Sequence, residues 1–190
     1  MTPRLVLRYL QAHMTAAEIY ESVTNGGASD FAEVVNVLNR NKPWCLIGGL
    51  AVNCYVEPVY TVDADIVVVA EHLSAIRNEL AASGFRLEQF AHPLNAKKVL
   101  GKLNVQFTQD DRYQNFIARA QPREVLGQSV PVADLNDIVQ GKVWAWSDEK
   151  RRLSKRKKDE LDLIRIAEGF PELRRNMPNE ITSQLEEETR

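Results

Sequence analysis

Residues 47–68, IGGLAVNCYVEPVYTVDADIVV, decide the fold and the candidate chemistry of this chain. Two aspartates, Asp63 and Asp65, open an apolar segment whose valine and isoleucine content is typical of a buried strand. Because successive side chains on a strand point to opposite faces, the two carboxylates share one face, roughly 6–7 Å apart. Burying such charges is unfavourable unless something compensates them. A hard cation such as Mg²⁺, which prefers oxygen ligands, could bridge the pair.

A pair of glycines lies near the start of the same stretch. Gly48 and Gly49 follow a predicted strand at 44–47 and lead into a short helix that Pro58 ends. Glycines between a strand and a helix let backbone N–H groups approach an anion, and the helix dipole adds to the attraction. Each motif alone has a plain structural interpretation, as a turn and as exposed charges at the start of a strand. Together, in this order, they indicate a nucleoside triphosphate with its Mg²⁺.

The rest of the chain alternates between helical and strand patterns. The predicted helices cover residues 15–24, 31–40, 71–83, 110–120 and 134–168, the last as two helices that meet near 147–154. The predicted strands cover residues 44–47, 64–70, 85–90, 97–100 and 103–108, followed by a hairpin within 123–132. This order predicts an α/β or α+β fold in which helices flank a mixed β-sheet.

The chain has the length of one domain with a small helical appendage, at 190 residues. Its composition, 44% apolar and 26% charged, is ordinary for a globular protein and can supply a core. The predicted organisation is N-terminal helices in residues 1–43, a mixed-sheet core in 44–133, helices that pack on the core in 134–176 and a frayed tail in 177–190.

Charge, cysteine content and hydropathy exclude several classes of protein. The net charge is −2, so no global field marks a nucleic-acid or membrane protein. Cys45 and Cys54 lack CxxC or zinc-type spacing, and we expect both to be reduced. No apolar run reaches the ~18 residues of a membrane span, and residues 1–13 do not resemble a signal peptide. We therefore expect a cytoplasmic protein without a membrane partner.

The motif IGGLAV followed by YTVDADIVV resembles the signature of the DNA polymerase β-like nucleotidyltransferase superfamily. In that superfamily a strand-to-helix Gly-Gly or Gly-Ser precedes Asp-x-Asp. The chain is most similar to the small bacterial nucleotidyltransferases that include abortive-infection toxins of the AbiEii type, whose second motif commonly reads R-x-T-x-D-I-D. Thr61, Asp63 and Asp65 match this motif, whereas Val59 stands at the arginine position.

The resemblance implies a Mg²⁺- or Mn²⁺-dependent transfer of a nucleoside monophosphate from a nucleoside triphosphate to a hydroxyl acceptor. It assigns catalysis and metal binding to the two aspartates, and nucleotide binding to Gly48, Gly49, Thr61 and Lys142. The same bacterial proteins carry a helix with a lysine, then a basic stretch that ends in Asp-x-x-Asp. Supporting roles beside the site are thereby implied for Lys158, Asp159 and Asp162. Plain intrahelical ion pairs are the alternative interpretation of these three residues.

One position departs from the superfamily pattern. A third carboxylate usually comes from a neighbouring strand, and Gln106 occupies the corresponding place in LNVQFT, residues 103–108. Glutamine can offer a carbonyl oxygen to the metal but cannot act as a base, and Asp110 or Asp111 is a candidate substitute. The alternative function is therefore a degenerate member of the superfamily that binds a nucleotide or a partner without catalysis. A plain interaction domain with two surface aspartates is the third hypothesis.

A strongly basic run, KRRLSKRKK, covers residues 150–158 and places seven cations in nine positions. One interpretation is a solvated helix or inter-helix loop. The other is a phosphate-binding patch for tRNA or another RNA, which would supply the hydroxyl acceptor. A protein side chain or a small molecule such as an aminoglycoside is the other candidate acceptor, and the basic run favours RNA or a phosphate-bearing partner. A role as the toxin of a toxin–antitoxin pair, with a cognate antitoxin as partner, rests on the resemblance alone.

Overall fold

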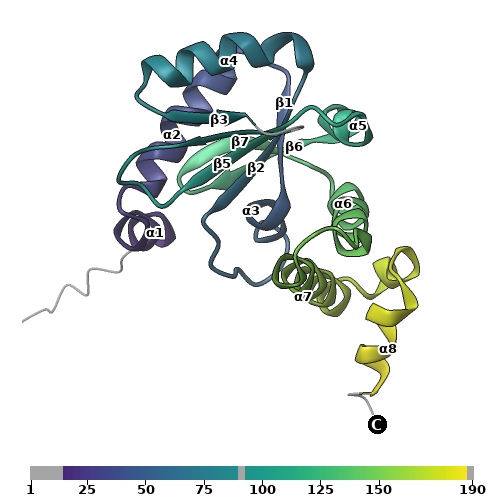
Figure 1. The fold of residues 1–190 in the computed structure, drawn as a ribbon. Coiled ribbons are helices and arrows are strands. Elements are labelled where there is room, and N and C mark those ends of the chain that lie inside the picture. Colours follow the sequence, from purple (N-terminus) through teal and green to yellow (C-terminus); the bar gives the residue numbers. More distant parts are fainter. Residues whose placement is uncertain (1–14, 90–92, 188–190) are drawn as a thin grey trace, which may run out of the picture.

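The computed structural model describes residues 15–89 and 93–187 (Figure 1). Its strands are β1 (Trp44–Ile47), β2 (Asp63–Val68), β3 (Arg86–Gln89), β4 (Leu94–Lys97), β5 (Asn104–Thr108), β6 (Gln121–Val125) and β7 (Gln128–Val132). They form a 7-stranded mixed sheet in the order β3-β4-β5-β2-β1-β7-β6. Its helices are α1 (Ala16–Thr24), α2 (Gly27–Arg40), α3 (Gly48–Val52), α4 (Ala70–Ala82), α5 (Asp111–Arg119), α6 (Leu135–Ser147), α7 (Leu153–Gly169) and α8 (Asn179–Glu187), with a 3₁₀ helix, η1, at Pro171–Asn176. The predicted α/β fold class is confirmed.

β2 lies at the centre of the sheet and carries both aspartates. It pairs antiparallel with β1, which places Ile47 opposite Asp65, and parallel with β5. Leu46 on β1 and Ile66 on β2 are fully buried. Both strands have neighbours on each side, and their continuous apolar runs reflect burial on both faces of the sheet.

Helices flank both faces of the sheet. Figure 1 shows α2 and α4 on one side and α3, α6 and α7 on the other, where α6 and α7 lie next to the start of β2. The amphipathic pattern of α2 explains its position, because Phe31, Val34 and Leu38 recur at helical spacing and are fully buried. The helices on the opposite side bring polar and charged side chains toward the two aspartates.

Two sequence-based expectations about the elements were wrong. The strand expected at 97–100 lies earlier, at β4, because Leu94 faces the core while Val99 and Leu100 are exposed. The frayed tail expected over 177–190 is a helix, α8, across most of its length. Ile181 and Leu185 stabilise this helix because both side chains are buried against the rest of the protein.

Other expectations concern single residues and the termini. Cys45 and Cys54 are free thiols, of which Cys45 is buried and Cys54 is partly buried. Within residues 15–89 and 93–187, none of the helices has the length and apolar character needed to cross a bilayer. The first part of the expected N-terminal segment, residues 1–14, and the end of the strand expected at 85–90 lie outside the described residues.

Candidate active site

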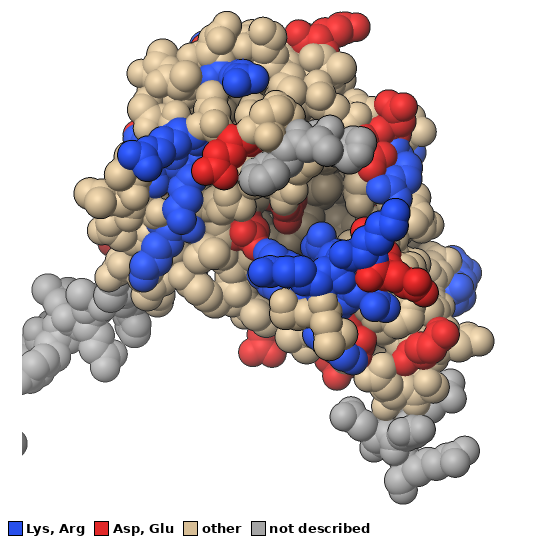
Figure 2. All heavy atoms as spheres, in the orientation of Figure 1, with Lys and Arg blue, Asp and Glu red and all other residues tan. Residues whose placement is uncertain are grey.

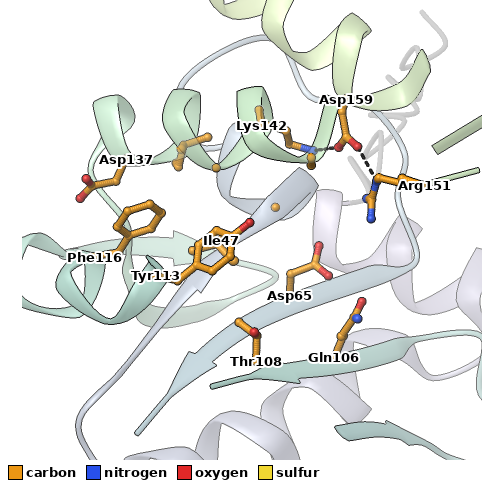
Figure 3. A pocket seen from close by; sticks show the side chains of 14 residues that line it. Ile47, Asp65, Gln106, Thr108, Tyr113, Phe116, Asp137, Lys142, Arg151 and Asp159 are labelled. Atoms are coloured by element: carbon orange, nitrogen blue, oxygen red, sulfur yellow. Dashed lines mark hydrogen bonds and ion pairs between the residues drawn. The ribbon is translucent and has the colours of Figure 1, made fainter. Parts of the chain in front are cut away.

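Asp63 and Asp65 stand on one face at the start of β2, as the alternation of the strand predicts. In the parallel register of β2 and β5, Asn104 lies beside Asp63 and Gln106 lies beside Asp65. Figure 3 shows Asp65 and Gln106 on neighbouring strands with their side chains turned into the same cavity. The strand that the resemblance selected for a third carboxylate is thus the neighbour of β2, and it carries amides at both positions.

Gly48 makes room for the carboxylate of Asp65. It begins α3 with a φ of 72°, in the left-handed region that favours glycine. A Cβ at this position would collide with the Asp65 side chain, including its Oδ2 atom. A Cβ on Gly49 would meet Thr61 at an ordinary contact distance of 3.6 Å. The two glycines therefore have different roles, and only Gly48 is required by the space around it.

The carboxylate of Asp63 is held by two nitrogen donors. Lys155 Nζ lies 2.6 Å from its Oδ2, and Asn104 Nδ2 donates to its Oδ1 at 3.3 Å. Burial alone would raise the pKa of Asp63, but the hydrogen bond and charge of Lys155, together with the hydrogen bond of Asn104 and the charge of Lys158, lower the pKa overall. Burial does raise the pKa of Asp65, against the opposing charge of Lys142. The two acids thus have different electrostatic environments, although they share one face.

Lys142 on α6 joins the two aspartates of the Asp-x-x-Asp motif on α7. Its Nζ lies 2.9 Å from Asp159 Oδ1 and 2.6 Å from Asp162 Oδ2, with all three side chains almost fully buried. Burial lowers the pKa of Lys142, but the two carboxylates outweigh it and raise the pKa overall. Arg151 contacts Asp159 at 2.8 Å (Figure 3). Arg165 contacts Asp162, also at 2.8 Å. This network fixes α6 against α7.

One face of α7 is turned toward the cleft. Lys155, Lys158, Asp159 and Asp162 follow the i, i+3, i+4, i+7 spacing of a single helix face. Lys158 Nζ donates to the hydroxyl of buried Thr61 at 3.0 Å, just before the aspartates of β2. Lys158 is the one residue of the basic run that the sequence predicted at the site, and Lys155 was not predicted there. The helical spacing was the signal that could have separated the cleft-facing members of the run from the rest.

Two adjoining cavities contain these side chains. The smaller, of about 80 Å³, brings together most of the predicted site residues with the cleft-facing basic ones: Gly49, Thr61, Asp63, Asp65, Gln106, Lys142, Arg151, Lys155, Lys158 and Asp159. The larger, of about 170 Å³, shares Asp65 and Gln106 with it and extends to Tyr113 and Phe116. Figure 2 shows a hollow on this face, with basic side chains along its lower rim and acidic atoms inside it.

The substitutes considered for the third acid do not reach the aspartates. Asp110 caps α5 by accepting from the backbone N–H of Arg112 at 3.0 Å, and it also pairs with that guanidinium at 2.7 Å. Asp110 and Asp111 follow the end of β5. Because β2 and β5 run parallel, these two residues lie past the C-terminal end of β2, whereas Asp63 is at its start. Val59, at the arginine position of the motif, is 40% exposed in the loop before β2.

The oxygen donors at the cleft fit one hard divalent cation. Asp63 and Asp65 provide carboxylate oxygens, and Gln106 provides an amide carbonyl, all of which are ligand types that Mg²⁺ accepts. Among the residues that the structure describes, no group of three or more His, Cys, Asp or Glu side chains could hold a metal. A second cation, as in two-metal phosphoryl transfer, would lack a carboxylate of its own.

Comparison with known proteins adds evidence on the fold. No protein-family model matches the sequence, and no curated protein matches it significantly. The structure is similar to that of the antibiotic-resistance factor ANT(2'')-Ia, with a TM-score of 0.58 and 14% identity, covering 87% of this chain and 98% of that one. A second structure of ANT(2'')-Ia, in complex with adenylyl-2''-tobramycin, has a TM-score of 0.55 and 15% identity, covering 83% of this chain and 98% of that one.

Two further solved structures have the same architecture. The lincosamide antibiotic adenylyltransferase LnuA, with lincomycin bound, has a TM-score of 0.50 and 13% identity, covering 71% of this chain and 94% of that one. An antigenic nucleotidyltransferase-like protein from Paracoccidioides brasiliensis has a TM-score of 0.51 and 19% identity, covering 75% of this chain and 76% of that one. The narrower resemblance to AbiEii-type toxins stays a prediction. The chain has the fold of these solved nucleotidyltransferases.

Proposed function

We propose that this chain is a Mg²⁺- or Mn²⁺-dependent nucleotidyltransferase, which moves a nucleoside monophosphate from a nucleoside triphosphate to a hydroxyl acceptor. The observation that supports the proposal best is the cavity in which Asp63 and Asp65 face Arg151, Lys155 and Lys158. Carboxylates can hold a divalent cation, and the basic side chains around them can hold phosphate oxygens. The combination suits a triphosphate with its metal better than either ligand alone.

The side chains divide into those that hold the nucleotide and those that hold the cleft together. Lys158 lies beside Thr61 in the smaller cavity, and Arg151 lines both cavities, so we assign contact with the triphosphate to these two side chains. Lys142 already has two carboxylate partners. Its main role in our proposal is to position α7, while direct contact of Lys142 with the triphosphate stays a prediction from the resemblance.

The proposed reaction forms one phosphorus–oxygen bond and breaks another. The acceptor hydroxyl oxygen attacks the α-phosphorus, the bond to the departing pyrophosphate breaks, and the hydroxyl proton passes to solvent or a carboxylate. A divalent cation held by Asp63 and Asp65 would neutralise charge on the phosphate oxygens. Gln106 cannot accept the proton, so its part in the proposal is to offer its carbonyl oxygen to the cation or to the acceptor hydroxyl.

We favour a small hydroxylated molecule as the acceptor. The larger cavity lies beside Asp65 and has a partly aromatic wall formed by Tyr113 and Phe116. Two of the similar structures contain small molecules, adenylyl-2''-tobramycin in one and lincomycin in the other. Transfer to RNA through residues 150–158 is the weaker alternative, because three cations of that run, Arg151, Lys155 and Lys158, line the small cavity at the aspartates. A protein acceptor, a toxin role and a cognate antitoxin stay predictions.

A label-transfer assay tests the proposal. The full chain is incubated with each α-³²P-labelled nucleoside triphosphate, Mg²⁺ or Mn²⁺, and either aminoglycosides, lincosamides or bulk tRNA. We expect label on an acceptor that disappears in Asp63→Ala and Asp65→Ala but persists in Asp111→Ala, an exposed aspartate outside the cleft. Transfer that survives the loss of both cleft aspartates would contradict the proposal.

A nucleotide-binding protein without catalysis is the second candidate. Asn104 and Gln106, rather than acids, stand beside the two aspartates, and this observation favours it. It predicts that the chain binds a nucleoside triphosphate with Mg²⁺ in calorimetry while no label moves to any acceptor. Failure of both transfer and binding would leave the interaction domain as the remaining hypothesis.

A further inference from the structure

The positive charge that contacts Asp63 in the cleft is the side-chain ammonium group of Lys155. Lys155 Nζ lies 2.6 Å from Asp63 Oδ2, although 92 positions separate the two residues in sequence. The other carboxylate oxygen accepts from Asn104 at 3.3 Å. Both oxygens of one of the two aspartates are therefore occupied by nitrogen donors from this chain.

The position of Lys155 is set by buried contacts on the same helix. Lys158, one turn further along α7, contacts Thr61, and Asp159 is held by buried Lys142. The side chain of Lys155 is 39% exposed and that of Asp63 is 22% exposed. The pair is therefore open to solvent at the edge of the cleft, and α7, which carries Lys155, is held in place by the buried pair of Asp159 with Lys142.

The charges of the site match this arrangement. Two divalent cations need several carboxylates to balance them, but the strand beside β2 offers the neutral side chains of Asn104 and Gln106. Lys155 also neutralises Asp63. The remaining negative charge at the aspartates suits a single divalent cation that arrives with a nucleotide.

We propose that the cleft binds one divalent cation per nucleotide and that the Lys155 ammonium supplies, at Asp63, the positive charge that a second metal ion would bring. The inference rests on the proposed nucleotide site and specifies its metal content. Lys155 is a tethered cation in this arrangement, and it competes with any metal ion for the Asp63 oxygen.

The metal content can be counted without measuring turnover. The free Mn²⁺ signal in electron paramagnetic resonance is titrated with the full chain, first without nucleotide and then with α,β-methylene-ATP, and separately its GTP, CTP and UTP counterparts, at a concentration equal to that of the protein. Parallel equilibrium dialysis counts the bound nucleotide. The test variant is Lys155→Met, and Lys98→Met is its matched control. Lys98 also pairs with a carboxylate, that of Glu33 at 2.7 Å, but it lies outside the two cleft cavities.

We expect one Mn²⁺ per bound nucleotide in the wild-type protein. Lys155→Met should raise the affinity for Mn²⁺ without nucleotide by about tenfold, because a positive charge next to a divalent ion is removed. Lys98→Met should leave it unchanged. Two Mn²⁺ per nucleotide in the wild type, or equal affinities in wild type and Lys155→Met, would overturn the inference while leaving the nucleotide site intact. Absence of nucleotide binding in the wild type would overturn the proposed function and this inference with it.

Discussion

The substitution Gly48→Ala tests the construction of the cleft without reference to any ligand. Gly48 has a φ of 72°, and a Cβ there would overlap the side chain of Asp65. A residue with a Cβ in the left-handed region costs about 1–2 kcal/mol, and overpacking of a tight site costs about 1–3 kcal/mol. We expect Gly48→Ala to lower the free energy of unfolding by about 3 kcal/mol, and Tm by about 6–12 °C for a domain of this size.

Urea unfolding of three variants provides the measurement and its control. Gly49→Ala should be neutral or stabilising by up to about 1 kcal/mol, since its Cβ would make ordinary contacts within a helix. In the double variant Gly48→Ala with Asp65→Ala, the colliding carboxylate is gone, so the two changes should couple by about 1 kcal/mol or more. The reasoning is refuted if Gly48→Ala unfolds within about 0.5 kcal/mol of the wild type, or if the two glycine variants are equally stable.

Three further predictions concern two polar side chains of the cleft and a buried aspartate on α2. Lys142→Met should lower the free energy of unfolding in urea by about 2–3 kcal/mol, because it leaves two buried aspartates with fewer partners. The control, Lys157→Met at an exposed lysine, should unfold within about 0.5 kcal/mol of the wild type, and an equally small change in Lys142→Met would contradict this prediction. Gln106→Asp should raise Mn²⁺ affinity about tenfold by calorimetry, and an unchanged affinity would mean that this position does not face the metal. Burial raises the pKa of Asp30, so its charged form opposes folding above that pKa. Asp30→Asn should therefore be more stable than wild type at pH 7, with a gap that narrows as the pH falls below the pKa of Asp30, and a gap that does not change between pH 7 and pH 4 would refute this.

Local patterns were sufficient to predict the centre of the sheet. The apolar runs at 44–47 and 64–70 identified β1 and the body of β2, and alternation placed Asp63 and Asp65 on one face. The choice of Gln106 came from the resemblance to the nucleotidyltransferase superfamily, and the parallel register of β2 and β5 places this residue beside Asp65. The two strands and the shared face of the aspartates follow from hydrophobic periodicity and strand geometry, which act over a few residues.

Contacts between distant segments could not be predicted in the same way. The pairing of Lys155 with Asp63 depends on where α7 packs, and the sequence gives no register between a helix and a strand that are so far apart. Polar composition suggested a frayed C-terminal tail, but Ile181 and Leu185 are only four residues apart and pack on one face of α8. Tertiary burial of two side chains outweighed the polar character of their neighbours.

The most direct test of the account is calorimetric titration of the full chain with each α,β-methylene nucleoside triphosphate, with and without Mg²⁺. We predict saturable binding of at least one nucleotide that requires Mg²⁺ and weakens about tenfold or more in Asp65→Ala, but not in Asp111→Ala. Absence of binding for all four nucleotides, or equal affinity in the wild type and Asp65→Ala, would contradict the claim that this cleft holds a nucleotide and its metal.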